Sequence, residues 1–319
     1  MTTELLIENN NKLYEPITQD GIVWTTERQG VPGQLSFKVV KDSTLDFTEG
    51  NVVRLRIDNK DVFYGYVFKK KRNKDHIIDV TAYDQLRYLK NKDVCEFKNK
   101  RAGQIIMLIA NKCNLQTGSI VNTGYVIPSR LENNITYFDM IQNALDLTLQ
   151  NNKKLYVMYD DFGKITLKNV ENMKLNLLID SETGENFDYE SSIDNDTYNQ
   201  VKLVYENDKT GKRDVYIEKS TDSINQWGLL QYFDTLKEGE NGKAKAQALL
   251  DLYNSKTRTL SIRNAFGDLR VRAGSVLPVI LDIGDIKVNQ YMLVEKCKHT
   301  FKNDEHFMEL NLRGGEFIA

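Results

Sequence analysis

The sequence predicts an α+β protein that is mainly β, with two related β domains, each a sheet or barrel, and an α+β region between them. Three observations lead to this fold class. A pattern of segments near the N-terminus recurs in the same order near the C-terminus. Apolar residues in both of these regions alternate with polar ones, which is typical of half-buried strands. In the middle of the chain the apolar residues are instead spaced as in amphipathic helices.

The recurring pattern decides the expected domain organisation. Each copy contains three segments in the same order. The first is strand-like, the second begins with a glycine and the third begins with a histidine. The matched stretches are 35–38 with 260–263, 50–52 with 274–276, and 76–82 with 306–312. We expect the two copies to superpose, with Gly50 and Gly274 in equivalent turns and His76 and His306 at matching structural positions.

The first β domain is predicted to cover residues 1–91. Apolar residues and arginines alternate over 53–57, and a turn rich in Asp and Asn follows them. The next strand, over 62–72, ends in the one strong charge run of the chain, four consecutive basic residues that begin at Lys69. A solvent-exposed hairpin tip is the ordinary account of such a run, and contact with an acidic partner is the alternative.

The middle α+β region is predicted to cover residues 92–194. An amphipathic helix is expected over 101–114. A second helix is expected to begin at Thr136, where Asp139 makes a near match to a capping box. A hairpin with its turn at 160–163 follows the second helix.

The second β domain is predicted to cover residues 195–319 and to contain one inserted helix. The polar stretch 172–196 that leads into it is expected to be a loop or linker. A hairpin is predicted between 201–205 and 215–217, because the residues between these two segments are rich in turn formers. The helix is expected over about 243–255, before the second copy of the recurring pattern.

Composition limits the function classes. A chain of 319 residues has room for about two or three domains. The net charge of −2 implies no bulk attraction to nucleic acid or to an anionic membrane. Three widely spaced cysteines form no disulfide framework and favour a reducing compartment. We find neither a signal-peptide core nor a membrane-spanning run, and we expect a soluble protein made in the cytoplasm.

The residues that could carry chemistry do not converge. Cys297, His299 and His306 lie close in sequence and would be the candidate metal ligands, but a fourth ligand is missing, and satisfied strand side chains are the ordinary account. Asp160 and Asp161 are adjacent in a turn, where neighbouring side chains point apart. The sequence has neither a Gly-x-Ser-x-Gly nor a His-Glu-x-x-His motif. We therefore predict no enzyme activity, no catalytic residue, no metal ion and no cofactor.

Several further stretches occur in a set order along the chain and resemble one known family. They are Ala82-Tyr83-Asp84-Gln85-Leu86-Arg87-Tyr88-Leu89, Phe138-Asp139-Met140-Ile141, 159–167, Ser192-Ile193-Asp194 with Tyr198-Asn199, Trp227-Gly228-Leu229-Leu230-Gln231, and 267–274. With the Ala-rich third helix, they are similar to the XkdQ/YqbQ-type baseplate hub family of contractile phage tails and phage-tail-like particles. The resemblance extends from about residue 20 to the end of the chain.

The resemblance implies a structural role. Hubs of this kind are trimers, similar to the N-terminal part of type VI secretion spike proteins, and each chain carries two domains that resemble the tail-tube subunit. A threefold ring of such chains presents a near-sixfold face to a sixfold tube, and its other face receives a trimeric spike. The implied partners are the chain itself as a homotrimer, the tail tube protein, the central spike protein, baseplate wedge proteins and the tape-measure protein. No membrane is implied, and the implied location is a tail particle (virion or bacteriocin) assembled in the bacterial cytoplasm.

By analogy with tube subunits, candidate interface residues lie in the strand over 62–72 and the loop over 266–272. They are Phe63, Tyr64, Tyr66, Lys69, Lys70, Lys71, Arg72, Asp268, Arg270 and Arg272. Two alternatives from other classes stay open. One is a tail-associated cell-wall or glycan hydrolase, which would need converging carboxylates, and the other is an adaptor or carbohydrate-binding module built on β sandwiches.

Overall fold

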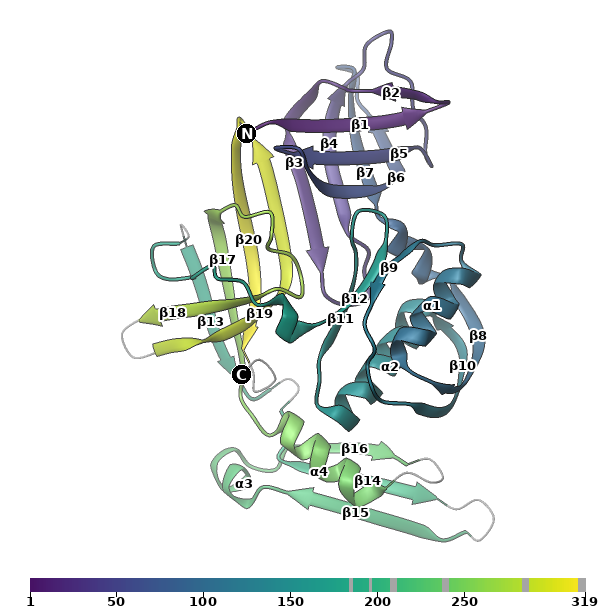
Figure 1. Cartoon of the computed structure of the whole chain (residues 1–319). Coiled ribbons are helices and arrows are strands. Elements are labelled where there is room, and N and C mark those ends of the chain that lie inside the picture. The colour runs from purple at the N-terminus through teal and green to yellow at the C-terminus, as the bar shows by residue number, and fades with distance from the viewer. Residues whose placement is uncertain (184–185, 195–196, 207–210, 237–240, 283–286, 315–319) are drawn as a thin grey trace.

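Two β modules of the same topology share one sheet in this protein, shown by a computed structural model (Figure 1). The structure describes residues 1–183, 186–194, 197–206, 211–236, 241–282 and 287–314. The largest sheet has 12 strands, in the order β13-β17-β20-β19-β3-β4-β7-β6-β5-β1-β2, with β18 paired to β19 outside this path. The fold is therefore mainly β, as the sequence predicts.

The first module contains seven strands. They are β1 (Thr3–Asn9), β2 (Lys12–Tyr14), β3 (Thr18–Glu27), β4 (Gln34–Val40), β5 (Val52–Ile57), β6 (Lys60–Arg72) and β7 (Ile77–Tyr83). Alternation along these strands sends one set of side chains into a core that includes Leu35, Phe37 and Val39. A 3₁₀ turn, η1 (Gln85–Lys90), follows the module.

The second module repeats this arrangement with five strands. They are β13 (Asn186–Ser192), β17 (Thr257–Phe266), β18 (Val276–Asp282), β19 (Lys287–Lys302) and β20 (Glu305–Gly314). The pairing order β17-β20-β19-β18 matches β4-β7-β6-β5, and β13 pairs with β17 as β3 pairs with β4. The strand β13 lies in the stretch 172–196, so the expectation of a loop or linker there is wrong.

The turns before β5 and β18 are built alike. Gly50 (φ +88°) and Gly274 (φ +94°) have left-handed backbones that favour glycine. The Gly50 N–H donates to the Val67 carbonyl and the Gly274 N–H to the Val294 carbonyl, each at 2.8 Å. The next residue closes each turn with a side-chain oxygen, because Asn51 Oδ1 accepts from the Thr48 N–H and Ser275 Oγ accepts from the Arg272 N–H. The recurring sequence pattern therefore corresponds to a recurring backbone.

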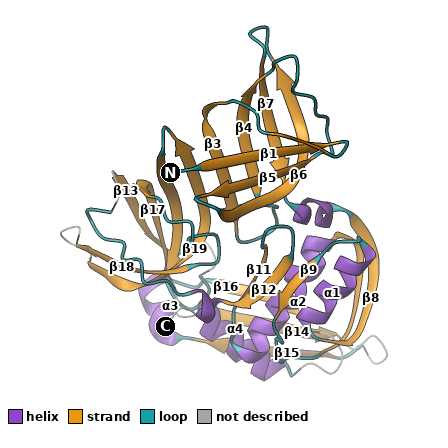
Figure 2. Cartoon of the chain, turned by 45° about the horizontal axis from the view of Figure 1, so that its top comes forward, coloured by secondary structure: helices purple, strands orange, loops and turns teal. Residues whose placement is uncertain are grey.

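The two modules are joined edge to edge. Strand β3 pairs with β4 on one side and with β19 on the other, so the sheet runs without a break through both modules. Figure 2 shows that this strand-rich part is free of α-helices, which gather in the rest of the molecule.

The middle region packs two helices between small sheets. Its elements are β8 (Lys92–Lys100), α1 (Ala102–Lys112), β9 (Thr117–Ile120), β10 (Ile127–Thr136), α2 (Tyr137–Asn152), β11 (Tyr156–Asp160), β12 (Ile165–Asn169) and η2 (Val170–Met173). The predicted cap of α2 is confirmed, since the Asp139 N–H donates to Thr136 Oγ1 at 3.1 Å and the Thr136 N–H to the Asp139 carboxylate at 3.2 Å. The hairpin β11–β12 is confirmed as well.

A small α/β insert separates β13 from β17. It consists of β14 (Gln200–Glu206), β15 (Arg213–Lys219), α3 (Thr221–Trp227), β16 (Gln231–Thr235) and α4 (Gly242–Tyr253). The predicted hairpin and α4 are confirmed, whereas α3 is a second helix that the sequence analysis did not predict. Most of the expected hairpin turn, 207–210, lies outside the described residues. Buried Ala246 and Leu249 pack α4 against one face of the three-stranded sheet.

The two equivalent glycines provide a matched test of how the second module rests on the middle region. A Cβ on Gly274 would lie 2.7 Å from Val157 Cγ1, whereas a Cβ on Gly50 would meet no atom within 4 Å. Both Gly→Ala substitutions force a left-handed backbone on alanine, at roughly 1–2 kcal/mol each. We expect Gly274→Ala to lower the free energy of unfolding by about 1 kcal/mol more than Gly50→Ala, because of overpacking. Urea denaturation measures both, and equal losses would contradict the contact with Val157.

Candidate assembly surface

The sheet that passes through both modules has an open strand edge in each of them. One end is β13, which pairs only with β17. In the first module, β5 pairs with the first half of β6, up to Tyr66, and β7 pairs with β6 from its opposite side. Among the strands that the structure describes, none pairs with the outer side of β6 from Lys69 to Arg72.

The same half-strand is occupied in the second module. There β3 pairs antiparallel with β19, placing Glu27 opposite Lys296 and Trp24 opposite His299. Lys296 Nζ lies 2.7 Å from the Glu27 carboxylate, and the Trp24 and His299 rings stack with centroids 4.8 Å apart. This internal junction shows how one module receives a strand from the next.

A bidentate ion pair closes the end of the internal junction. The Arg28 Nε and Nη2 atoms donate to the Glu295 carboxylate at 2.7 and 3.1 Å. The Arg28 side chain is only 8% exposed, so this pair is better shielded than ordinary surface pairs and strengthens the junction.

The two open edges carry opposite charges. Lys69, Lys71 and Arg72 are exposed on β6, and Asp188 and Glu190 are exposed on β13. Asp188 has a partner within its own module, the exposed Arg263 at 3.3 Å, a contact of little energy at the surface. The charge run that the sequence analysis singled out therefore lies along an open strand edge.

The structure places the three aromatic candidate interface residues differently. Phe63 is 3% exposed in the core of the first module, so it offers no surface to a partner and its assignment was wrong. Tyr64 and Tyr66 are half-buried. The ring of Tyr64 packs edge-on against Phe162 of the middle region, with centroids 5.6 Å apart, and the ring of Tyr66 packs against Tyr88 of η1, with centroids 6.0 Å apart.

A pocket of about 400 Å³ lies beside these tyrosines, between β6, η1 and the hairpin turn of the middle region. Aromatic and amide side chains line it, Gln85 and Gln116 among them. Gln85 is already engaged, because its Nε2 donates to the Gln116 carbonyl and its Oε1 accepts from the Gln116 N–H. The residues that line the pocket therefore offer mainly rings and amides, with Cys113 as their one thiol and no carboxylate, imidazole or amine among their side chains.

Lys70 differs from its basic neighbours. Its Nζ donates to the Phe47 carbonyl at 2.5 Å and lies 4.7 Å from the centre of the Phe47 ring. This side chain holds the loop before β5 in place and is less available to a partner than Lys69 and Lys71, whose side chains alternate to the other face.

The three candidate residues of the loop before β18 divide into an exposed pair and an enclosed cation. The Asp268 carboxylate accepts hydrogen bonds from Arg270 Nε on Oδ1 and from Arg270 Nη2 on Oδ2, and these bonds lower the pKa of the Asp268 carboxyl. Arg272 instead points inward, with its guanidinium 3.8 Å from the centre of the Tyr159 ring and its Nη2 donating to the Asp160 carbonyl at 2.8 Å. The prediction of Arg272 as an interface residue was therefore wrong, because it connects the second module to the middle region.

Two buried carboxyl groups lie near enough to this cation to interact with it electrostatically. Asp84 accepts from the Gly33 and Leu86 N–H groups at 2.8 and 3.0 Å, and Asp160 accepts from Gln85 Nε2 at 2.9 Å. Burial raises the pKa of Asp84 well above its ordinary value, and burial raises the pKa of Asp160 as well. Burial also lowers the pKa of Arg272. Because these groups come from the first module, the middle region and the second module, they form a polar lock among all three.

The residues weighed as metal ligands form a hydrogen-bonded chain instead. His299 Nε2 donates to the Val271 carbonyl at 2.8 Å, so its Nδ1 is free to accept from His306 Nε2 at 2.8 Å. Cys297 Sγ lies 3.1 Å from His299 Nε2. Burial lowers the pKa of His299 to about 3 and that of His306 to about 4. Both imidazoles are therefore neutral and structural.

His76 and His306 share a backbone position but not a side-chain environment. The carbonyl of His76 accepts from the Lys41 N–H and that of His306 from the Gly267 N–H, each at 2.8 Å. The His76 side chain is exposed and contacts Arg72 at 2.9 Å.

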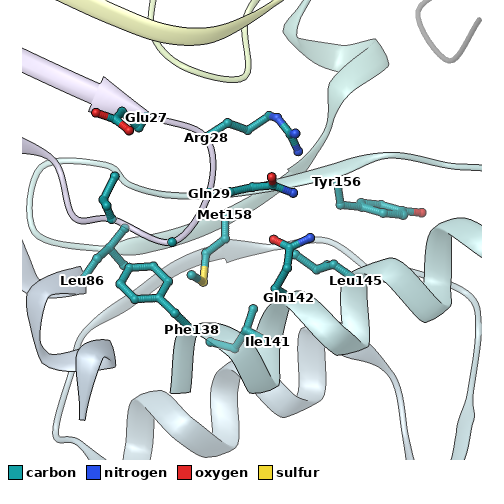
Figure 3. A pocket seen from close by; sticks show the side chains of 12 residues that line it. Glu27, Arg28, Gln29, Leu86, Phe138, Ile141, Gln142, Leu145, Tyr156 and Met158 are labelled. Atoms are coloured by element: carbon teal, nitrogen blue, oxygen red, sulfur yellow. The ribbon is translucent and has the colours of Figure 1, made fainter. Parts of the chain in front are cut away.

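Other hollows and clusters give no sign of a catalytic centre. Figure 3 shows a cavity between the loop after β3 and helix α2, where Phe138, Ile141 and Leu145 point toward Leu86 and Met158. Its volume of about 20 Å³ is enough for a single water molecule. Within the described ranges, no group of three or more His, Cys, Asp or Glu side chains could hold a metal ion. Among the helices of the described residues, none is long and apolar enough to cross a membrane.

The acidic strand β13 is the part of this surface that sequence reasoning missed. Its signal is weak because only Phe187 and Tyr189 alternate with polar residues over seven positions. Pairing with β17 along the whole strand, from Asn186 to Ser192, outweighs that low propensity.

Comparisons with known proteins agree with this architecture. A family model described as YQBQ-like matches residues 22–313. The chain is 30% identical to the protein YqbQ of Bacillus subtilis (strain 168) over 324 residues, which is 97% of this chain and 96% of that protein. It is 32% identical to the phage-like element PBSX protein XkdQ of the same organism over 274 residues, 83% of this chain and 82% of that protein.

Two solved structures share the fold at low sequence identity. The 43 kDa tail protein of prophage MuSo2 from Shewanella oneidensis matches with a TM-score of 0.72 and 12% identity, over 99% of this chain and 100% of that one. The E. coli c3393 protein, described as a type VI secretion component with structural similarity to phage T4 tail proteins gp27 and gp5, matches with a TM-score of 0.59 and 9% identity. That match covers 99% of this chain and 78% of the other. The fold is thus one that phage tail proteins and a type VI secretion component share.

The polar lock predicts a large difference between two nearby arginines. Replacing Arg272 by Met leaves buried Asp84 and Asp160 without their cation, and we expect a loss of about 3 kcal/mol in the free energy of unfolding. Arg270→Met removes an exposed pair and should leave the urea midpoint nearly unchanged. Equal midpoints for the two variants would contradict the lock.

From the hydrogen-bonded pair His299 and His306 we predict that the protein loses stability in acid. Because the folded-state pKa values lie below the ordinary 6.5, the unfolded chain binds more protons, and the histidine contribution to stability is complete only above pH 6.5. The His306 contribution should be lost as the pH falls from 6.5 toward about 4, and the His299 contribution as it falls toward about 3. We expect the double variant His299→Gln, His306→Gln to show a flatter dependence of unfolding free energy on pH, and His76→Gln to follow the parent chain. A parent-like slope in the double variant would refute this account.

Proposed function

This chain belongs to the YQBQ-like family, and from that membership and its duplicated modules we propose that it is the structural baseplate hub of a contractile phage-type tail. In this proposal three copies form a ring that joins a sixfold tail tube to a trimeric central spike. The partners are further copies of the chain, the tube protein, the spike protein and the baseplate wedge proteins, with the tape-measure protein inside the ring. The proposed domains are the segments 1–91, 92–194 and 195–319, except that β13 (Asn186–Ser192) belongs with the second module through its pairing with β17, so that module begins before the predicted boundary.

The observation that carries this proposal is that one rim of the molecule is built from elements present in both modules. The hairpin β6–β7 corresponds to β19–β20, and the loop before β5 corresponds to the loop before β18. Each loop is tied to the hairpin of its own module by the same backbone hydrogen bond, from Lys41 to His76 and from Gly267 to His306. Three chains in a ring would therefore offer six similar positions along this rim.

The remaining elements occur once per chain. The middle region and the insert have no counterpart in either module. In Figure 1 the middle region lies below the first module and beside the second, and the insert lies below both modules. Three chains would offer these elements in three positions, which suits a threefold partner. A ring of this kind would thus meet sixfold symmetry at one rim and threefold symmetry at the other.

The proposal also accounts for the absence of converging catalytic groups in the described residues. The buried carboxyl groups serve a lock within the chain, and the histidines satisfy one another. The description of the type VI secretion relative, with its likeness to phage tail proteins, supports the same assignment by analogy.

The stoichiometry of the assembled chain tests the proposal. Mass photometry of the purified full chain, alone and mixed with the spike protein produced from the same gene cluster, should show a species of three chains. A chain that stays monomeric in the mixture, or a species of six chains, would contradict the hub. Peptidoglycan zymography should show no cleared band, and a cleared band would favour the hydrolase alternative.

A further inference from the structure

We propose that neighbouring copies of this chain join by strand addition, with β13 of one copy pairing antiparallel with the outer half of β6 of the next copy. The register is that of the internal junction between β3 and β19. This inference rests on the proposed ring, and it names the surface that closes it. The occupant of each open edge is a second copy of the same chain.

The first step is the equivalence of β13 and β3. Trp24 of β3 is paired with Leu35 of β4, and Tyr189 of β13 is paired with Leu260 of β17. Leu35 and Leu260 are themselves equivalent, because each is paired with the corresponding residue of the next strand, Ala82 or Leu312. Tyr189 therefore stands where Trp24 stands in the first module.

The second step is the equivalence of β6 and β19. Both strands pass an irregularity in their pairing at the same place, after Val67 in β6 and after Val294 in β19. Beyond this irregularity Lys69 corresponds to Lys296, and Arg72 corresponds to His299. Their partners on β7 and β20 correspond in the same way.

The register between copies follows from these two equivalences. Lys296 pairs with Glu27 inside the chain, so Lys69 would face Ser192 of the neighbour. In the same way Lys71 would face Glu190, and Arg72 would face Tyr189.

The side chains brought together by this register are complementary. Lys71 and Glu190 would form a cross-strand ion pair on one face of the sheet. On the other face the Arg72 guanidinium would lie over the Tyr189 ring, in the place of the His299–Trp24 stack. Tyr189 already packs against the core of its own module, so its ring is held in place for this contact.

Charge also protects the open edges from wrong partners. Two β6 edges placed together would oppose Lys69, Lys71 and Arg72 with the same residues, and two β13 edges would oppose Asp188 with Glu190. Only the mixed pairing of a basic edge with an acidic edge brings opposite charges together. We therefore expect assembly to weaken at high salt.

Cysteine pairs test the register. A double variant Lys69→Cys, Ser192→Cys should form a disulfide between copies under mild oxidation, and non-reducing gels should show a ladder that ends at three chains. The matched control Lys69→Cys, Asp188→Cys places the thiols four residues out of register, too far apart to react. Cross-linking of the control with equal yield, or no cross-link in the first pair, would overturn the register.

Charge reversal tests the energetic claim with a rescue. Lys71→Glu and Glu190→Lys should each raise the concentration at which trimers form by about tenfold or more, and the combined variant should recover assembly. Lys74→Glu, on the exposed turn of the same hairpin, should assemble like the parent chain. A trimer that forms normally in all variants and gives no cross-link would sink this inference and leave the ring standing. A chain that stays monomeric and uncross-linked throughout would overturn both.

Discussion

The pairing of β3 with β19 is the contact on which the rest of the structure depends. It turns two similar modules into one sheet, so the second module is related to the first by the geometry of a strand ladder and not by a flexible linker. Ladder hydrogen bonds fix the spacing of adjacent strands at about 4.8 Å, which makes this junction as rigid as the interior of either module. Two side-chain contacts, the Arg28–Glu295 ion pair and the Trp24–His299 stack, stabilise the same junction.

The polar lock extends this rigidity to the parts that occur once per chain. Arg272 leaves the second module to meet Tyr159 and Asp160 of the middle region, close to Asp84 at the end of the first module. The hairpin turn at Phe162 makes a second attachment, because its ring packs on Tyr64. Phe162 has a left-handed backbone (φ +48°), a conformation that bulky residues rarely adopt, and this strain is consistent with a turn shaped for docking. Relative movement of the two rims is therefore restrained within a single chain.

The sequence predicted the duplication because both copies keep features that backbone geometry demands. A glycine is required where φ is positive before β5 and β18, and alternating apolar residues are required where one face of a strand is buried. The helix cap at Thr136 was equally readable, since its hydrogen bonds join residues three positions apart.

The errors arose where long-range contacts decide. Phe63 lies on an alternating strand, and local pattern alone did not show which face is the core. Arg272 is enclosed only because residues 112 positions away in the chain form its site. The strand β13 is polar and short, and its pairing with β17 across the insert outweighs its local sequence. At these positions the neighbouring residues in the sequence do not indicate which distant residues the side chain or strand contacts in the fold.

End-on images of the assembled ring test the central claim most directly. In a reconstruction of the ring, cross-sections perpendicular to its axis should show six similar densities at the rim that contains the β6–β7 and β19–β20 hairpins. The sections with the middle region and the insert should show three. Uniform sixfold symmetry throughout, or a ring in which the two modules of one chain are not neighbours, would contradict the account.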